Sequence, residues 1–123
     1  MPVPPGLRQH TIAELFLRLQ EWLSRHPVAH VLFSPADITL GQDEILQPDP
    51  FVYRTASGKP LRDRTDITEL LLVIEVTSSS PARYDRELKR RRYRRAGVAE
   101  DWVVDLEERT VECWRPGAES GEL

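Results

Sequence analysis

The sequence predicts an α/β fold in which a mixed β-sheet is flanked by helices. The run of residues 70–76 has six apolar side chains and one carboxylate, which is typical of a strand buried on both faces. Residues 11–26 show the apolar stripe of an amphipathic helix, and Pro81 suits the first turn of a second helix. The order of helix, strands, buried strand, helix and two closing strands therefore indicates a mixed sheet between helices.

The first helix is expected to begin at Thr11, because Thr11 and Glu14 have the spacing of a capping box. Pro27 would end it, since proline cannot continue a helix. The apolar side chains of this segment recur at helical spacing and are expected to face the core. They are Ile12, Leu15, Phe16, Leu19, Trp22 and Leu23.

Two or three strands are expected before the buried strand, in the segments Val28–Phe33, Asp37–Leu40 and Phe51–Tyr53. Asp49 has a proline on each side, so two backbone donors are missing and this point cannot lie in the middle of a central strand. We expect a bend there that aims Asp49 outward. The polar residues 54–69 predict a long loop.

After the buried strand, the second helix is expected over residues 81–96, with Gly97 as its left-handed stop. Trp102–Val104 predicts a strand and Leu106–Arg109 a turn. Thr110–Trp114 would then pair back as an antiparallel strand.

Length and composition predict a single domain over residues 1–123, because a chain of this size forms one core. The only cysteine, Cys113, excludes an internal disulfide and favours a reducing compartment. No apolar run approaches the roughly 18 residues of a membrane span. The first ten residues lack the apolar core of a signal peptide. We therefore expect a cytoplasmic protein with no membrane partner.

The net charge of −3 is unevenly distributed along the chain. Residues 81–95 contain eight basic and two acidic side chains, and the remaining residues contain nine basic and eighteen acidic ones. Such a basic segment can bind a phosphate backbone. It can also dock on the acidic surface of the same protein or of a second copy.

Glu75 stands inside the buried strand, where an ionised carboxylate costs several kcal/mol unless a cation compensates it. Alternation along the strand would place Glu75 on one face with Leu71, Val73 and Thr77. The compensating cation can be a metal ion, a lysine or an arginine.

Asp49 begins the strand that precedes the buried one. If the two strands are neighbours, the carboxylates of Asp49 and Glu75 converge, and the main-chain carbonyl of Val76 completes an oxygen-rich site suited to Mg²⁺ or Mn²⁺. The alternatives without a metal are an ion pair for Glu75 and a turn role for Asp49.

Lys89 lies on the second helix and recurs with Asp85 and Tyr93 every four residues, so the three share a face. From the sheet-facing side, Lys89 could reach Glu75. Tyr93 and Trp102 are expected in the core. Four arginines on another side of the helix are expected to face solvent, as a solvated face or as a nucleic-acid-binding surface. They are Arg83, Arg86, Arg90 and Arg94.

Several short motifs between about His10 and Arg115 resemble, in their order and spacing, the Uma2 family of bacterial restriction-endonuclease-like proteins. This family belongs to the PD-(D/E)XK nuclease superfamily. The motifs are Pro48-Asp49, Val73-Ile74-Glu75-Val76-Thr77-Ser78, Tyr84-Asp85-Arg86-Glu87-Leu88-Lys89-Arg90, Tyr93, Ala96-Gly97-Val98 and Asp101-Trp102-Val103-Val104-Asp105.

The resemblance implies a restriction-endonuclease-like fold and an endonuclease that hydrolyses DNA phosphodiester bonds with Mg²⁺ or Mn²⁺. Asp49 would match the first acid and Glu75 the second, with the Val76 carbonyl as a further metal ligand. Thr77 stands where the superfamily signature has its lysine, and Lys89 would supply that group from the following helix. Lys89 would orient the attacking water or stabilise charge on the phosphate. Superfamily nucleases often dimerise to cut both strands, so a homodimer is a further expectation.

Two other interpretations stay open. The domain could be a catalytically inactive nuclease fold that binds nucleic acid or a protein partner, in which case Glu75 and Lys89 merely form an ion pair. It could also be a purely structural α/β domain. Against the Uma2 pattern we expect a shortened segment before the first helix, and Pro50 and Ser78–Ser80 depart from the pattern.

Overall fold

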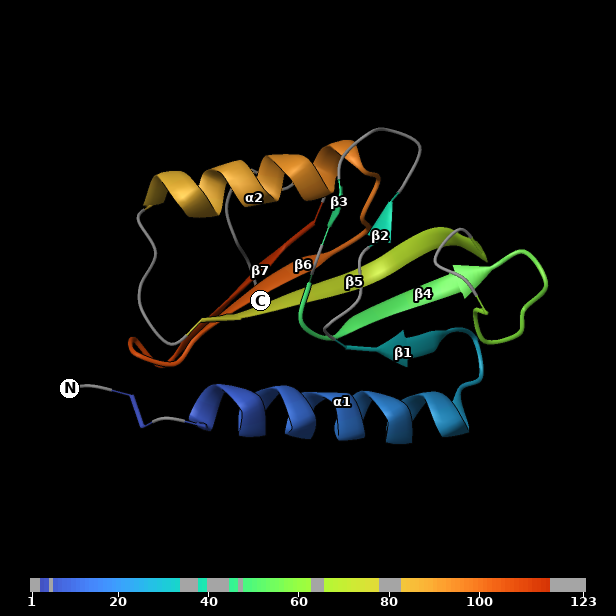
Figure 1. The fold of residues 1–123 in the computed structure, drawn as a ribbon, viewed down its shortest axis with the longest axis horizontal. Helices are drawn as coiled ribbons and strands as arrows, with labels where there is room; N and C mark the ends of the chain where they lie inside the picture. The colour runs from blue at the N-terminus through green and yellow to red at the C-terminus, as the bar shows by residue number, and fades with distance from the viewer. Residues whose placement is uncertain are drawn as a thin grey trace.

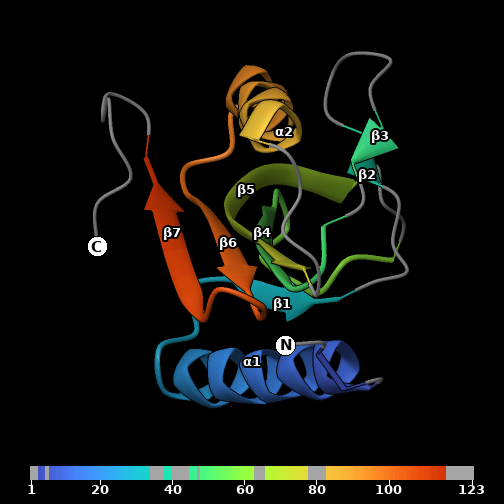
Figure 2. The same ribbon diagram turned by 90° about the vertical axis from the view of Figure 1, so that its left-hand side faces the viewer.

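In the computed structural model, the described residues form a five-stranded sheet between two helices, with a separate two-stranded pair (Figures 1 and 2). The structure describes residues 3–4, 6–33, 38–39, 45–46, 48–62, 66–77 and 83–115. In chain order the elements are α1 (Leu7–Arg25), β1 (His30–Leu32), β2 (Ile38–Thr39), β3 (Ile45–Leu46), β4 (Phe51–Thr55), β5 (Ile67–Thr77), α2 (Arg83–Arg95), β6 (Asp101–Asp105) and β7 (Thr110–Trp114).

The large sheet is mixed, with the strand order β1-β4-β5-β6-β7. β5 and β6 run parallel, and every other neighbouring pair in this sheet is antiparallel. A parallel pair needs a long crossover connection, and α2 supplies it. Figure 2 shows α1 on one face of the sheet and α2 on the other, so the domain has three layers.

β5 lies at the centre of the sheet, and its residues Val73 and Ile74 are both 0% exposed. Val73 packs with Tyr93 of α2, whereas Ile74 packs with Ile12 of α1. The prediction of a strand buried on both faces is therefore confirmed, with one apolar cluster under each helix.

A bulge interrupts β5 at Leu71. The register with β4 shifts between Val52 and Tyr53, which leaves Leu71 as an extra residue. Leu71 packs against the cluster under α1, while Val73 belongs to the cluster under α2. The expectation that Leu71 and Val73 share a face is wrong, because the extra residue shifts the alternation of side chains.

α1 begins at Leu7, ahead of the predicted start, after Gly6 in the left-handed region at φ 91°. The hydroxyl of Thr11 donates to the carbonyl of Leu7, and Glu14 pairs with Arg18 at 2.9 Å. The predicted capping box is therefore wrong, since both side chains lie inside the helix and bond along it.

α2 spans Arg83–Arg95 and stops at Gly97, whose φ of 81° favours glycine. The N–H of Gly97 donates to the carbonyl of Arg94 (3.1 Å), and that of Val98 donates to the carbonyl of Tyr93 (3.0 Å). This is a Schellman motif, and the buried side chain of Val98 provides its apolar contact. The predicted helix stop is confirmed.

The hairpin of β4 and β5 is longer than predicted. β4 continues to Thr55 and β5 begins at Ile67, so the predicted polar loop loses residues at both ends. Arg54 and Glu69, expected in that loop, are paired across the two strands, with an ion pair of 3.3 Å. Their polarity reflects exposed positions on a strand. Among the described residues, neither helix combines the length and the apolar character that a membrane span needs.

Candidate active site at the end of β5

Asp49 lies just before β4 and is only 2% exposed. Its N–H donates to the carbonyl of Ile74 (3.0 Å), and the N–H of Ile74 donates to the carbonyl of Pro50 (2.9 Å), which fixes the backbone against β5. Its Oδ2 accepts a hydrogen bond of 2.7 Å from the N–H of Val76. The expectation that Asp49 aims outward is wrong, because the carboxylate turns in to satisfy a β5 donor beyond the start of β4.

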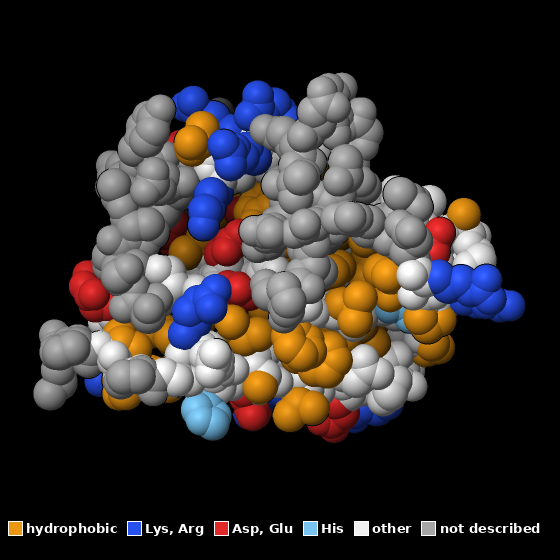
Figure 3. Space-filling model, viewed as in Figure 1, with side chains coloured by type: hydrophobic (Ala, Val, Ile, Leu, Met, Phe, Trp, Pro, Cys, Tyr) orange, Lys and Arg blue, Asp and Glu red, His pale blue; other side chains and the backbone are white. Residues whose placement is uncertain are grey.

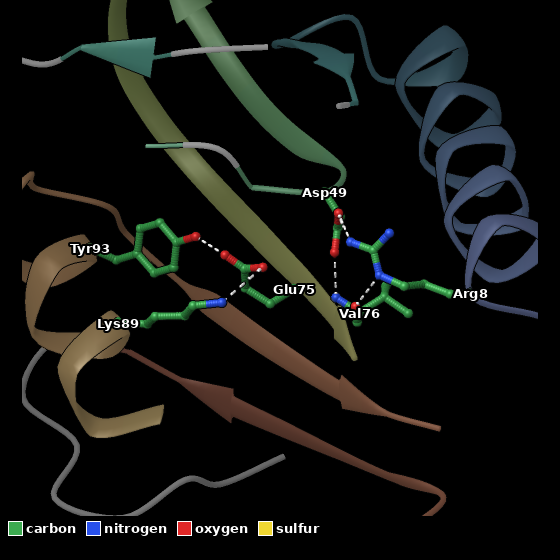
Figure 4. A network of polar contacts seen from close by, with 6 residues as sticks. All are labelled: Arg8, Asp49, Glu75, Val76, Lys89 and Tyr93. Carbon is green, nitrogen blue, oxygen red and sulfur yellow. Dashed lines mark hydrogen bonds and ion pairs between the residues drawn. The ribbon is translucent and has the colours of Figure 1, made fainter. Parts of the chain in front are cut away.

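Glu75 is held by two side chains of α2, as Figure 4 shows. The hydroxyl of Tyr93 donates to its Oε1, and Nζ of Lys89 lies 3.9 Å from its Oε2. Of the cations that the sequence left open for Glu75, the structure places Lys89 beside it. The side chain of Lys89 is 59% exposed, so its ammonium group also contacts solvent.

Burial raises the pKa of Glu75 above its ordinary value. The hydrogen bond from Tyr93 and the charge of Lys89 oppose this rise, while the negative charge of Asp49 adds to it. The charges that act on Glu75 thus come from α2, from Arg8 and from the segment just before β4.

Tyr93 was expected in the core, and it is buried, but its hydroxyl group belongs to the site. Burial and the neighbouring charge of Glu75 raise the pKa of Tyr93, so the hydroxyl stays protonated and remains a donor. The signal in the sequence was its position four residues after Lys89, on the same face of the helix.

Arg8, in the first turn of α1, completes the group of side chains at this end of β5. Its Nη2 donates to Oδ1 of Asp49 (2.7 Å), and its Nε donates to the carbonyl of Val76 (2.8 Å). Figure 4 shows Arg8 reaching this point from the helix opposite to the one that carries Lys89. Sequence reasoning missed Arg8, since nothing in its proline-rich surroundings points to a strand end far along the chain.

The donor atoms at this point suit a hard divalent cation. Asp49 and Glu75 offer carboxylate oxygens and Val76 offers its carbonyl oxygen, which are the ligands that Mg²⁺ and Mn²⁺ prefer. The guanidinium of Arg8 already shows that two of these groups attract a cation. No cluster of three or more His, Cys, Asp or Glu side chains occurs in the described part of the chain, so water would have to fill the remaining positions around an ion.

The family model of Uma2, described as "Putative restriction endonuclease", matches residues 1–123. The chain belongs to the Uma2 family. No curated protein matches it.

A similar solved structure is the crystal structure of "a putative nuclease belonging to DUF820 from Anabaena variabilis ATCC 29413", with a TM-score of 0.75 and 20% sequence identity. The match covers 97% of this Uma2 chain and 68% of that chain. It confirms the predicted fold, which is a restriction-endonuclease-like α/β fold with a mixed sheet flanked by helices.

Arg90 of this Uma2 domain does not face solvent as predicted, since it is only 7% exposed. Its Nη2 lies 3.7 Å from a carboxylate oxygen of Glu112, and its Nη1 lies 3.2 Å from one of Glu87. Its Cζ lies 3.2 Å from the centre of the Trp114 ring. Arg90 thus docks α2 on the acidic and aromatic surface of its own sheet, which corrects its assignment to the nucleic-acid surface.

The other three arginines assigned to that surface have different outcomes. Arg94 is exposed on α2, as expected. The side chains of Arg83 and Arg86 lie outside the described residues, so their assignment stays a prediction. Figure 3 shows basic side chains gathered over α2, at the top of the view.

Asp101 is a further acid under α2 in this Uma2 domain, and it was not singled out in the sequence. It pairs with Val73 in the register of β5 and β6, so it faces α2 as Val73 does. Burial raises its pKa to about 6, against the opposing charges of Arg90 and Arg94. The charges of Glu100 and Glu75 add to the rise.

Proposed function

We propose that this Uma2 domain is a divalent-metal-dependent endonuclease that hydrolyses DNA phosphodiester bonds. The observation that carries the proposal is that the Asp49 carboxylate is bonded to Val76, the residue after Glu75, at one end of β5, while Lys89 of α2 lies beside Glu75. The family description, "Putative restriction endonuclease", and the likeness to "a putative nuclease" support the proposal. We further infer that Asp49, Glu75 and Val76 hold Mg²⁺ or Mn²⁺.

When bound, such an ion lowers the pKa of a coordinated water and draws charge from a phosphate oxygen. The chain's own residues prepare the place for this chemistry. The N–H of Val76 fixes one oxygen of Asp49, and Tyr93 fixes one oxygen of Glu75. Lys89 has an exposed side chain whose ammonium group can orient the attacking water or stabilise the charge on the phosphate.

The outer face of α2 is the surface that we propose for the DNA backbone. A shallow groove there is lined by Leu88, Arg91, Arg94 and Arg95. Arginine contacts of this kind hold phosphates without reading the sequence. Arg83 and Arg86 of the same helix stay assigned to this surface, whereas Arg90 is occupied beneath the helix. We further propose that the protein is cytoplasmic. We also propose that it forms a homodimer, which would allow it to cut both DNA strands.

One observation favours a second function, that of a catalytically inactive nuclease fold that binds nucleic acid or a protein. Each acid already has a basic partner, Arg8 for Asp49 and Lys89 for Glu75. In that case the domain would bind DNA through α2 and show no response to metal ions.

The test is cleavage of supercoiled plasmid by the full chain with Mn²⁺ or Mg²⁺, over a range of salt concentrations. We expect nicked and linear products from the native protein and none from Asp49→Asn, which keeps the shape of the side chain and loses its charge. Glu75→Ala should abolish both cleavage and the rise in melting temperature that Mn²⁺ produces in the native protein. Intact plasmid at all salt concentrations, together with salt-sensitive DNA binding, would favour the inactive module.

A further inference from the structure

The guanidinium of Arg8 bonds two of the three groups proposed as metal ligands. Its Nη2 is 2.7 Å from Oδ1 of Asp49, and its Nε is 2.8 Å from the carbonyl oxygen of Val76. The other oxygen of Asp49 is bound by the N–H of Val76. The oxygen that points to Arg8 is thus the one that an incoming cation would need.

A metal ion would compete with Arg8 for these atoms. Oδ1 of Asp49 and the Val76 carbonyl are both at hydrogen-bond distance from Arg8. A divalent ion in contact with the same oxygens would lie within a few ångströms of the guanidinium charge, where like charges repel strongly in a partly buried site. Binding of the metal therefore competes with the contacts of Arg8.

Arg8 is placed so that it can leave the site without opening the core. Its side chain is 45% exposed, whereas that of Asp49 is 3% exposed. It belongs to the first turn of α1, and the buried residues of this helix are Ile12 and Leu23, further along. The helix dipole disfavours a positive charge in the first turn of a helix, and the first turn of α1 has no acidic side chain that would offset this. The contacts with Asp49 and Val76 are therefore what holds Arg8 in place.

We propose that Arg8 is a built-in cation that occupies the metal position, so that divalent metal binding requires its displacement. This inference rests on the proposed metal site of Asp49, Glu75 and Val76. It makes α1 a regulatory element, because whatever draws Arg8 away, such as the phosphate of a bound substrate, opens the site to metal. Metal and a polyanion would then bind with positive cooperativity.

The first test measures Mn²⁺ and Mg²⁺ binding by calorimetry for the native chain and for Arg8→Gln. Arg18→Gln is the matched control, because Arg18 lies in the same helix and its ion pair with Glu14 is exposed and away from the site. If Arg8 occupies the ligands about nine-tenths of the time, its removal should tighten metal binding about tenfold. Arg18→Gln should bind metal as the native chain does.

The second test follows metal binding in the native chain itself and uses a variant, Arg8→Lys, only to assign one signal. The Nε–H signal of Arg8 in nitrogen-15 NMR, assigned by its loss in Arg8→Lys, should move to the position of a free arginine as Mg²⁺ saturates the protein. Metal binding of equal strength in the native chain and Arg8→Gln, with an unchanged Nε–H signal, would overturn the role of Arg8 and leave the metal site standing. No metal binding in either protein would overturn the proposed metal site itself.

Discussion

The hydroxyl of Tyr93 donates a hydrogen bond to Oε1 of Glu75, across the interface between α2 and the sheet. Both groups are largely buried, so the contact is a charge-assisted hydrogen bond away from bulk water. It ties the orientation of the proposed metal ligand to the position of a helix, rather than to the strand alone.

Replacing Tyr93 by phenylalanine removes this hydrogen bond and keeps the buried ring. We expect the free energy of unfolding to fall by about 1.5–3 kcal/mol, the usual range for a hydrogen bond to a charged group. The pKa of Glu75 should rise further, because the hydrogen bond from Tyr93 lowers it in the native chain. Urea unfolding and carbon-13 NMR titration of Glu75 measure the two effects.

Tyr53→Phe is the matched control for Tyr93→Phe. Tyr53 is also buried, and its hydroxyl oxygen accepts a hydrogen bond of 3.2 Å from the N–H of Leu61, far from any carboxylate of the site. This variant should leave the titration of Glu75 unchanged. An equal shift of the Glu75 pKa in both variants would show that the shift does not come from the hydrogen bond of Tyr93.

Asp101 should make the stability of the domain depend on pH between about 4 and 6. Its pKa is about 6 in the folded chain against 3.8 ordinarily, so the folded state binds its proton more tightly than the unfolded state. The free energy of unfolding should therefore fall as pH rises through this window. Glu75, whose pKa is also raised, contributes with the same sign.

Urea unfolding at a series of pH values measures this effect. Asp101→Asn cannot ionise, so it should flatten the part of the decline that Asp101 causes while keeping a side chain of the same shape. Arg90, Arg94, Glu100 and Glu75 also act on Asp101 through their charges, so they are left unchanged in this variant. A decline that is as steep in Asp101→Asn as in the native chain would contradict the assignment.

Arg90→Gln should destabilise the fold. The change removes a buried cation stacked on Trp114 and leaves Glu112 without that partner. We expect a loss of about 2–3 kcal/mol in the free energy of unfolding, from the cation–π contact and the broken ion pair. Thermal melting measures it. Arg90→Lys keeps the charge and loses the planar stack on Trp114. Its melting temperature should therefore lie between those of the native chain and Arg90→Gln.

Arg94→Gln should act on DNA binding and not on stability. Arg94 is exposed on α2, so the melting temperature of the variant should stay close to that of the native chain. The affinity of the variant for DNA should fall equally for different DNA sequences. The slope of the logarithm of the binding constant against the logarithm of the salt concentration should decrease in magnitude by about one. Fluorescence anisotropy over a salt series checks this. An unchanged slope would remove Arg94 from the proposed surface.

Much of the framework could be predicted because it follows from local patterns. The apolar run around Val73 indicates a doubly buried strand in any tertiary context. Gly97 and Val98 have the composition of a Schellman motif, which depends on neighbouring residues alone. The closing strand Thr110–Trp114 was likewise predicted with the bounds that the structure has.

The parts that could not be predicted depend on the element against which each side chain packs, and that element is distant in the sequence. α2 meets the sheet through Tyr93, Lys89 and Arg90, so its inner face is largely polar and no apolar stripe marks it. Arg90 therefore seemed solvent-facing. The contact of Arg8 with Asp49 joins residues 41 positions apart, through a helix whose start was itself placed too late. The turn of Asp49 inward depends on the free N–H of Val76, which appears only once the strands are aligned.

The extra residue at Leu71 has a consequence for how the domain can change over time. It separates the part of β5 nearer the hairpin, which has a second register shift between Arg54 and Thr55, from the part that carries Glu75. A gain or loss of one residue near the hairpin can be absorbed by moving or removing the bulge, so Glu75 keeps its side of the sheet. The hairpin can therefore diverge in length while the acid at the far end of the strand is held in place.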